Sequence, residues 1–188
     1  MPPKVKITNK EIREAGLKLV QKDGANALNA RSIATVLNCS TQPIFSNFAT
    51  MDELQNAITN AAYEHYLSFL KSEAEAGKYP QYKAFGMAYI RFAKDEPELF
   101  RLLFMCDRND KELIPTVDFT TSVEIIMNTN KVTRETAELM HLEMWSCVHG
   151  IAVMLATSFV KLEWKLIDNM LSDIYRGLRT THLPEEKQ

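Results

Sequence analysis

The amino-acid sequence predicts an all-α protein, in which a small N-terminal domain of three helices precedes a larger helical bundle. Three observations favour this fold class. The 188 residues include only 6 Gly and 7 Pro, long segments are rich in Ala, Leu, Glu, Lys and Met, and no convincing run alternates between apolar and polar residues. Because 46% of the residues are hydrophobic, the chain can bury a substantial core and lacks the composition of a disordered or fibrous protein.

The first helix has a start and a stop that the sequence marks clearly. Thr8 and Glu11 have the spacing of a capping box, and Ile7 and Ile12 flank it as a hydrophobic staple. The helix is expected to end at Gly24, which can take up the left-handed conformation of a C-terminal cap.

A short second helix is predicted over residues 30–37. Asn29 precedes it with a side chain suited to an N-terminal cap. Asn38 follows it at a sharp turn, where a left-handed backbone is expected, and Asn tolerates that conformation better than other non-glycine residues. These signals place a tight turn directly after the second helix.

The third helix is short and reaches to Asn47. Ser40 or Thr41 is expected to cap it, and Pro43 fits its first turn, where a missing amide hydrogen costs nothing. We expect its apolar side chains to face the core of the domain; these are Ile44, Phe45 and Phe48.

The rest of the chain predicts longer helices. Thr50 and Glu53 form a second capping box that opens a helix over residues 51–76, and Gly77 and Pro80 follow its end. Pro97 fits a first turn and Thr133 fits a cap. Further helices are expected, within several residues at each end, at 81–94, 97–106, 116–130, 133–160 and 162–180.

Charge is distributed unevenly along the chain. Residues 1–49 carry seven basic and three acidic side chains, whereas the remainder carries 15 basic and 21 acidic ones, within a net charge of −2. A basic N-terminal segment before an acidic remainder suits binding to a polyanion. With so few charged side chains, a chance distribution of charge is the alternative.

Three short helices with a tight turn between the last two are typical of a helix-turn-helix, in which the third helix enters the major groove of DNA. Its exposed candidates for base edges are Thr41, Gln42, Ser46 and Asn47, and Gln can form a bidentate contact to adenine. The alternative for Gln42 is an ordinary solvated side chain. The full set of expected DNA-binding residues is Lys4, Lys6, Asn29, Arg31, Ser40, Thr41, Gln42, Phe45, Ser46 and Asn47, with Lys10 as a further phosphate partner.

The stretch 12–58 resembles the DNA-binding domain of the TetR family of transcriptional regulators. The matching residues are Ala15, Leu19, Gly24, Arg31, Ile33, Ala34, Leu37, Ser40, Ile44, Phe45, Phe48, Glu53 and Leu54. The resemblance implies a homodimeric repressor with a DNA-binding domain at 1–49, a ligand-binding and dimerisation domain at 50–188, and release from operator DNA by a small apolar or amphipathic effector. Phe45 stands where the family usually has a phosphate-binding Tyr, and Met51 stands where it often has Lys. Both departures remove a phosphate partner, and the N-terminal lysines are expected to compensate.

The C-terminal body carries a weaker signal. Trp145, His149 and Gly150 resemble a W-x3-H-G signature of one subgroup of the family, and the segment 97–104 is similar to that subgroup as well. His141, Trp145 and His149 recur every four residues and therefore share one helix face. The expected ligand-binding residues are Phe85, Tyr89, Phe104, Met105, His141, Trp145 and His149. Alternatively, Trp145 and His149 simply fill the core, and Gly150 allows two helices to approach closely.

The last two predicted helices are expected to form the dimer interface that the family uses. Their apolar side chains exceed what a free surface tolerates; the residues assigned to the interface are Ile151, Leu155, Phe159, Trp164, Ile167, Leu171, Ile174 and Leu178, with Val148 beside them. Packing within one chain would explain the same residues.

The sequence predicts neither catalysis nor a bound metal or cofactor. Glu138 and His141 have the E-x-x-H spacing of di-iron bundles, but such sites need two copies of the motif. Two alternatives stay open: a helical-bundle metalloenzyme and a non-specific DNA-binding protein. Scattered thiols at Cys39, Cys106 and Cys147, no apolar leader and no uncharged apolar run of about 18 residues predict a cytoplasmic protein without a membrane span.

Overall fold

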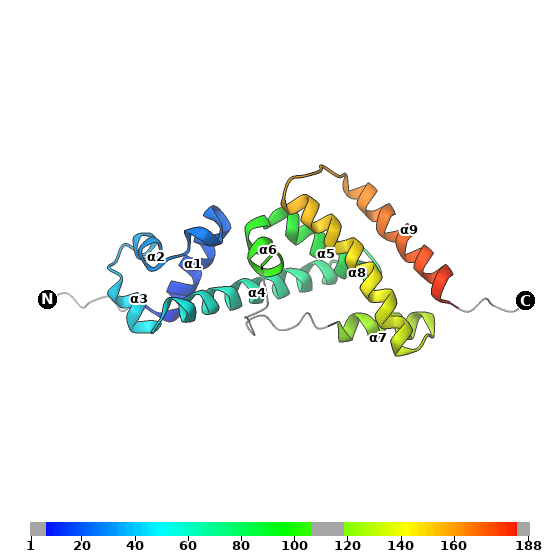
Figure 1. The fold of residues 1–188 in the computed structure, drawn as a ribbon, viewed down its shortest axis with the longest axis horizontal. Coiled ribbons are helices and arrows are strands. Elements are labelled where there is room, and N and C mark those ends of the chain that lie inside the picture. Colours follow the sequence, from blue (N-terminus) through cyan, green and yellow to red (C-terminus); the bar gives the residue numbers. More distant parts are fainter. Residues whose placement is uncertain (1–6, 107–118, 184–188) are drawn as a thin grey trace, which may run out of the picture. The chain divides into compact units, whose positions relative to one another are not determined.

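In a computed structural model of the chain, residues 7–106 and 119–183 are described, and they form helices and connecting turns without a strand. The predicted all-α class is confirmed. The elements, shown in Figure 1, are α1 (Asn9–Asp23), the 3₁₀ turn η1 (Ala25–Ala27), α2 (Ala30–Val36), α3 (Gln42–Asn47), α4 (Met51–Glu75), α5 (Gln81–Asp95), α6 (Pro97–Phe104), α7 (Thr120–Asn130), α8 (Arg134–Ala156) and α9 (Trp164–His182).

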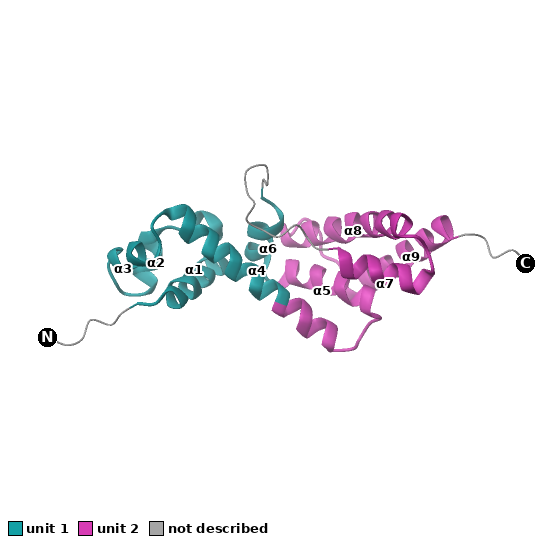
Figure 2. Cartoon of the chain, turned by 90° about the horizontal axis from the view of Figure 1, so that it is seen from below, with its two compact units in different colours: residues 1–67, 96–115 teal, residues 68–95, 116–188 magenta. Residues whose placement is uncertain are grey.

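The chain divides into two compact units, coloured separately in Figure 2. Unit 1 comprises residues 1–67 and 96–115, and unit 2 comprises residues 68–95 and 116–188. The division falls inside α4, whose helical hydrogen bonding continues through residues 67 and 68. One uninterrupted helix therefore belongs to both units.

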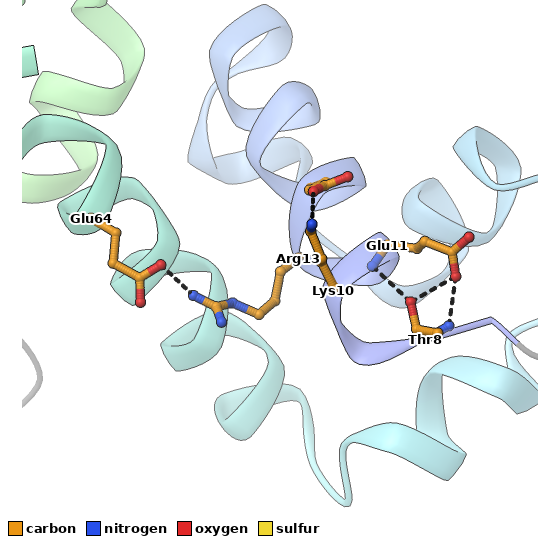
Figure 3. Close-up of polar contacts among 6 residues, drawn as sticks. Thr8, Lys10, Glu11, Arg13 and Glu64 are labelled. Atoms are coloured by element: carbon orange, nitrogen blue, oxygen red, sulfur yellow. Dashed lines mark hydrogen bonds and ion pairs between the residues drawn. The ribbon is translucent and has the colours of Figure 1, made fainter. Parts of the chain in front are cut away.

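The predicted capping box at the start of α1 is confirmed. The amide of Glu11 donates to Thr8 Oγ1 at 3.2 Å, and the amide of Thr8 donates to Glu11 Oε2 at 2.8 Å (Figure 3). The prediction of a left-handed cap at Gly24 is wrong, because its φ of 79° is combined with an extended ψ of 171°. The amide of Gly24 still donates to the carbonyl of Val20 at 2.9 Å, and the residue directly precedes η1. A positive φ still favours glycine at this position.

The start of α2 and the turn between α2 and α3 both match the sequence prediction. Asn29 Oδ1 accepts a hydrogen bond of 2.9 Å from the amide of Ser32, and Asn38 has the left-handed φ of 50°. The predicted side-chain cap of α3 is wrong for Thr41, which already has helical backbone angles and whose side chain makes no capping hydrogen bond. Its carbonyl instead accepts the amides of Ile44 and Phe45.

The core of unit 1 joins the three short helices to the first half of α4. Gly16 of α1 lies so close to α4 that a Cβ atom there would be 2.3 Å from Cδ1 of Ile58. The fully buried aliphatic side chains of this core are Ile12, Val20, Ile33, Ile44, Leu54 and Ile58. Their packing fixes the orientation of α3 within the unit.

The second predicted capping box, at the start of α4, is also confirmed in a modified form. The amide of Glu53 donates to Thr50 Oγ1 at 3.1 Å, while the Glu53 carboxylate accepts the amide of Ala49 at 2.7 Å. The carboxylate thus reaches one residue further back than in the standard arrangement. α4 then runs to Glu75, and Gly77 with φ of 65° follows.

Unit 2 is a bundle in which α8 packs against α5, α7 and α9. Thr133 caps α8 as predicted, accepting the amide of Thr136 at 3.3 Å. α8 ends at Ala156, earlier than the expected residue 160, and Ser158 takes a left-handed φ of 55° just beyond it. The beginning of the helix predicted at 116–130 lies outside the described residues.

By length and composition alone, α8 is apolar enough to cross a membrane, with an 18-residue window of mean hydropathy 1.3. Of that window, 44% is buried inside the protein. A central helix of a folded bundle has this same composition, because it is covered by neighbours on several faces.

Candidate DNA interface and aromatic–histidine cluster

The helix α3 presents one side to the core of unit 1 and the other to solvent. Ile44 and Phe48 are buried, whereas Gln42, Phe45 and Ser46 are exposed. The expectation that Phe45 belongs to the core is wrong, since 48% of the residue is exposed. Residues 44 and 48 are one turn apart and take the inward face, so residue 45 is rotated about 100° away from it.

Two of the polar side chains predicted to read bases are hydrogen-bonded to backbone carbonyls of their own unit. The Ser46 hydroxyl donates to the carbonyl of Gln42 at 2.9 Å. The Asn47 amide nitrogen donates to the carbonyls of Pro43 at 2.8 Å and Ile7 at 3.3 Å. The Gln42 amide makes no hydrogen bond or ion pair with any residue of the described part of unit 1, which leaves it available for an external partner.

The remaining predicted DNA-binding residues differ in how they are placed. Asn29 serves as a helix cap and also donates to the carbonyl of Ala27 at 3.2 Å, so its amide belongs to the structure of the head. Arg31 and Ser40 are exposed and Thr41 is half-buried. The other two residues predicted, Lys4 and Lys6, lie outside the described residues.

Some of the positive charge of unit 1 is paired within the unit. Lys10 lies 3.8 Å from Glu14, and Arg13 Nη2 lies 2.9 Å from Glu64 Oε2 on α4 (Figure 3). Both contacts are at the surface, where ion pairs contribute little and can be exchanged for other anions. The basic side chains without an ion pair among residues 7–67 are Lys18, Lys22 and Arg31.

In unit 2, two tyrosines of α5 bond two histidines of α8. Tyr82 Oη lies 2.9 Å from Nδ1 of His141, and Tyr89 Oη lies 2.9 Å from Nδ1 of His149. The tyrosines are seven residues apart and the histidines eight, which in each case spans two helical turns. The sequence prediction included Tyr89 and missed Tyr82, although the seven-residue spacing was a signal that both share one face.

Two further aromatic rings join these pairs into what we call the aromatic–histidine cluster. Trp145 stacks on His149, with ring centroids 4.9 Å apart and planes at 16°. Phe119 contacts both His141 and Trp145 edge-on, with centroid distances of 4.5 Å and 5.7 Å. The cluster comprises Tyr82, Tyr89, Phe119, His141, Trp145 and His149.

Burial keeps the polar members at one end of the cluster uncharged. Desolvation lowers the pKa of His141, and it raises the pKa of Tyr82, with a smaller contribution from Tyr175. The buried Nε2 of His141 makes no hydrogen bond among the described residues. An uncharged, buried group with one open hydrogen-bonding position can bind a polar atom of a ligand.

The other predicted ligand-binding residues are less closely connected to the cluster. Phe85 is half-buried on α5. Phe104 and Met105 belong to unit 1, where the ring of Phe104 meets that of Tyr66 edge-on with centroids 5.0 Å apart, and Met105 is exposed. Their role in ligand binding stays a prediction.

The residues predicted for a dimer interface fall into three groups of exposure. Val148, Ile151, Ile167 and Leu171 are buried within the chain, Phe159 is 79% exposed, and the others are half-buried. Three further leucines on α8 and α9, which the sequence prediction did not include, are exposed: Leu139, Leu142 and Leu166. A side chain that is already buried has little surface for a partner, so an interface on these helices would depend on the exposed residues.

Among the described residues, helices do not approach closely at Gly150, since a Cβ atom there would meet nothing within 4 Å. The same is true of Gly177 on α9.

The E-x-x-H pair does not converge on a common site. Glu138 is exposed and lies 3.9 Å from Arg134, whereas His141 is buried and bonded to Tyr82. Within residues 7–106 and 119–183, no group of three His, Cys, Asp or Glu side chains is arranged to hold a metal ion.

Comparison with known proteins identifies a domain of the chain and relates its fold to solved structures. Residues 82–171 match the family model of the tetracyclin repressor-like C-terminal domain. A putative TetR-family transcriptional regulator from Vibrio parahaemolyticus superposes with a TM-score of 0.63 at 12% identity, over 89% of this chain and 96% of that one. A TetR-family regulator from Haemophilus influenzae RD gives a TM-score of 0.63 at 16% identity, over 89% and 93% of the two chains. No curated protein sequence is significantly similar to the chain. Residues 82–171 therefore match a tetracyclin repressor-like C-terminal domain, and the chain as a whole shares the fold of these two TetR-family regulators.

Proposed function

We propose that the protein is a sequence-specific transcriptional repressor that binds operator DNA as a homodimer and leaves it when a small apolar or amphipathic ligand binds. The observation that carries the proposal is the solvent-facing side of α3, held on a packed three-helix core with its Gln42 amide available. A helix-turn-helix presents its second helix to the major groove in this manner.

Unit 1 is suited to DNA recognition because side-chain caps hold the starts of several of its helices. Thr8 and Asn29 cap α1 and α2, and Thr50 caps the start of α4, so these helix ends are held without the help of DNA. Exposed Arg31 can neutralise a phosphate while Gln42 reaches a base edge. The first contact supplies affinity and the second supplies specificity.

A homodimer would match the geometry of DNA. A twofold dimer places two recognition helices in successive major grooves, about 34–36 Å apart. The exposed apolar residues of α8, of α9 and of the segment between them, above all Phe159 in that segment, support an interface in this part of the chain.

The aromatic–histidine cluster supports a ligand site in unit 2. Its rings offer apolar surface, and His141 Nε2 offers a buried hydrogen-bonding position. α4 is the natural element for coupling, because the same helix belongs to both units. A coupling free energy of about 1–3 kcal/mol per site would be typical of such a switch.

The DNA-binding part is tested with duplexes enriched from a random library by the full-length protein. The enriched duplex and a scrambled duplex of equal length are compared at one stated salt concentration, because affinity for DNA depends steeply on salt. Gln42→Ala should reduce the preference between the two, while Arg31→Ala should weaken both alike. Equal affinity of the unsubstituted protein for the two duplexes would contradict specific recognition and favour a packaging protein.

The ligand part is tested by native mass spectrometry of the purified protein. A bound small molecule, identified and then added back at saturation, should lower the affinity for the enriched duplex. An unchanged affinity at saturation would contradict release by that ligand.

A further inference from the structure

We propose that Phe45 contacts the 5-methyl group of a thymine, so that the exposed face of α3 is built to read A·T base pairs. The inference rests on the proposed function, since it assumes that α3 enters the major groove. It names the chemical group that the helix would recognise there.

The exposed face of α3 is small and its composition is simple. Gln42, Phe45 and Ser46 are exposed, at spacings of three and four residues, so they share one side of the helix. Phe45 lies to one side of Gln42 on this face, with 48% of its surface accessible. A phenyl ring held in this way exposes apolar area that another apolar group can cover.

Hydrogen bonding within the unit reduces the number of groups that can read a base. The Ser46 hydroxyl donates to the carbonyl of Gln42, and the Asn47 amide nitrogen donates to two carbonyls. The face therefore offers mainly one amide, on Gln42, and one phenyl ring, on Phe45.

Both groups match the same base pair. A Gln amide can bond N6 and N7 of adenine, while the thymine methyl is the apolar group that unmodified DNA presents in the major groove. The phenyl ring of Phe45 has no hydroxyl to donate to a phosphate, so its contribution at this position is apolar contact. An amide and a phenyl ring on one helix face thus favour an A·T-containing half-site.

The test uses the duplex enriched from a random library by the full-length protein. Each thymine is replaced in turn by deoxyuridine, which removes the 5-methyl group and leaves the base-pairing edge unchanged. Loss of one buried methyl group should raise the dissociation constant about fourfold. We expect this loss at one or two thymines per half-site and little change at the others.

The Phe45→Ala variant, checked for folding by circular dichroism, assigns the effect to this side chain. With this variant, deoxyuridine at the sensitive positions should change the affinity less than about 1.5-fold, whereas Gln42→Ala should retain the full sensitivity. The substitution in the DNA leaves the unsubstituted protein unaltered, so the first result does not depend on how well the variant folds.

The outcomes separate the inference from the function on which it rests. If no thymine of an enriched duplex is sensitive, or if Phe45→Ala shows the same sensitivity as the unsubstituted protein, the contact to thymine is overturned while specific DNA binding stands. If the library yields no enriched duplex, the proposed function is overturned, and the inference falls with it.

Discussion

At the scale of single residues, Thr8 illustrates how much a short helix depends on its first turn. Its hydroxyl accepts the amide of Glu11, which would otherwise lack a partner at the helix start. Replacement by Ala should lower the free energy of unfolding by about 1 kcal/mol, measured by urea denaturation of the full chain. Thr8→Ser keeps the hydroxyl and should restore most of the loss; equal stability of the Ala and Ser variants would contradict the capping role.

The same cap should respond to acid. Hydrogen bonds from the backbone and then the side chain of Thr8 lower the pKa of Glu11 below its ordinary value of 4.5. A lowered carboxyl pKa stabilises the folded state above about pH 4.5, and this contribution disappears as the pH falls through the folded-state pKa. The difference in stability between the unsubstituted protein and Thr8→Ala should therefore shrink between pH 6 and pH 3. A difference that is constant over this range would exclude an ionised Glu11 from the cap.

His141 should give the bundle of unit 2 a different dependence on pH. Burial lowers its pKa below the ordinary 6.5, so the unfolded chain takes up a proton at a higher pH than the folded chain does. Stability should consequently decline as the pH falls from 6.5 through the folded-state pKa. Thermal unfolding at pH 7.5 and 5.5 should show a smaller decline for His141→Gln than for the unsubstituted protein. Because the other three histidines are common to both proteins, an equal decline would assign the effect elsewhere.

Residues that act on their own backbone were the most predictable from sequence. Thr8, Asn29, Asn38 and Thr50 do what their side chains favour locally, with a cap or a left-handed turn. The environment of Phe45 was not predictable in this way. A six-residue helix has too few apolar positions to define its buried face by periodicity, so the packing of the other helices decides which side turns inward.

At the scale of helices, the contact of α1 with α4 depends on Gly16. A Cβ atom there would lie 2.3 Å from Cδ1 and 2.8 Å from Cγ1 of Ile58, whose side chain is fully buried. Gly16→Ala should destabilise the protein by about 1–3 kcal/mol through overpacking. The matched variant Gly150→Ala meets no atom within 4 Å in the chain and should instead gain about 0.5–1 kcal/mol from helix propensity. Thermal denaturation of the two variants measures the contrast, and similar stabilities would contradict the close packing at Gly16.

Existence and order of the helices were predictable, while some of their ends were not. Pro97 and Thr133 mark the starts of α6 and α8 as expected. α8 ends at Ala156, and the sequence prediction placed this end too late, at residue 160. The apolar pattern continues to Phe159 and Val160, beyond the left-handed Ser158. An apolar residue continues a pattern whether it lies on a helix or in the turn that follows, so periodicity alone extends the helix too far.

At the scale of the whole molecule, Phe159 offers the most direct test of the proposed homodimer. It is 79% exposed in the single chain, and a negative charge there should be harmless unless a partner covers it. Phe159→Glu should shift the protein from dimer to monomer in size-exclusion chromatography with light scattering. The control Leu67→Glu, at an exposed leucine of α4, should remain dimeric. A dimer that survives Phe159→Glu unchanged would move the interface away from this residue.

Sequence features also differed in how far they revealed the candidate sites. The three short helices of unit 1 were predictable because their spacing is local and their caps are explicit. The aromatic–histidine cluster was found in part, since Tyr89, His141, Trp145 and His149 were predicted, whereas Tyr82 and Phe119 come from separate elements that only the tertiary structure brings together. Contacts between distant segments leave little trace in a single sequence.

The unbroken course of α4 through residues 67 and 68 has a consequence for how such proteins diversify. Recombination within this helix can exchange the N-terminal helices between relatives only if the helical register is kept. One inserted or deleted residue turns the following part of the helix by about 100° and shifts that part by about 1.5 Å. Gains or losses of seven residues, close to two full turns, disturb the orientation least. Length changes in this segment should therefore be inherited in multiples of a turn, while loops elsewhere in the chain vary freely.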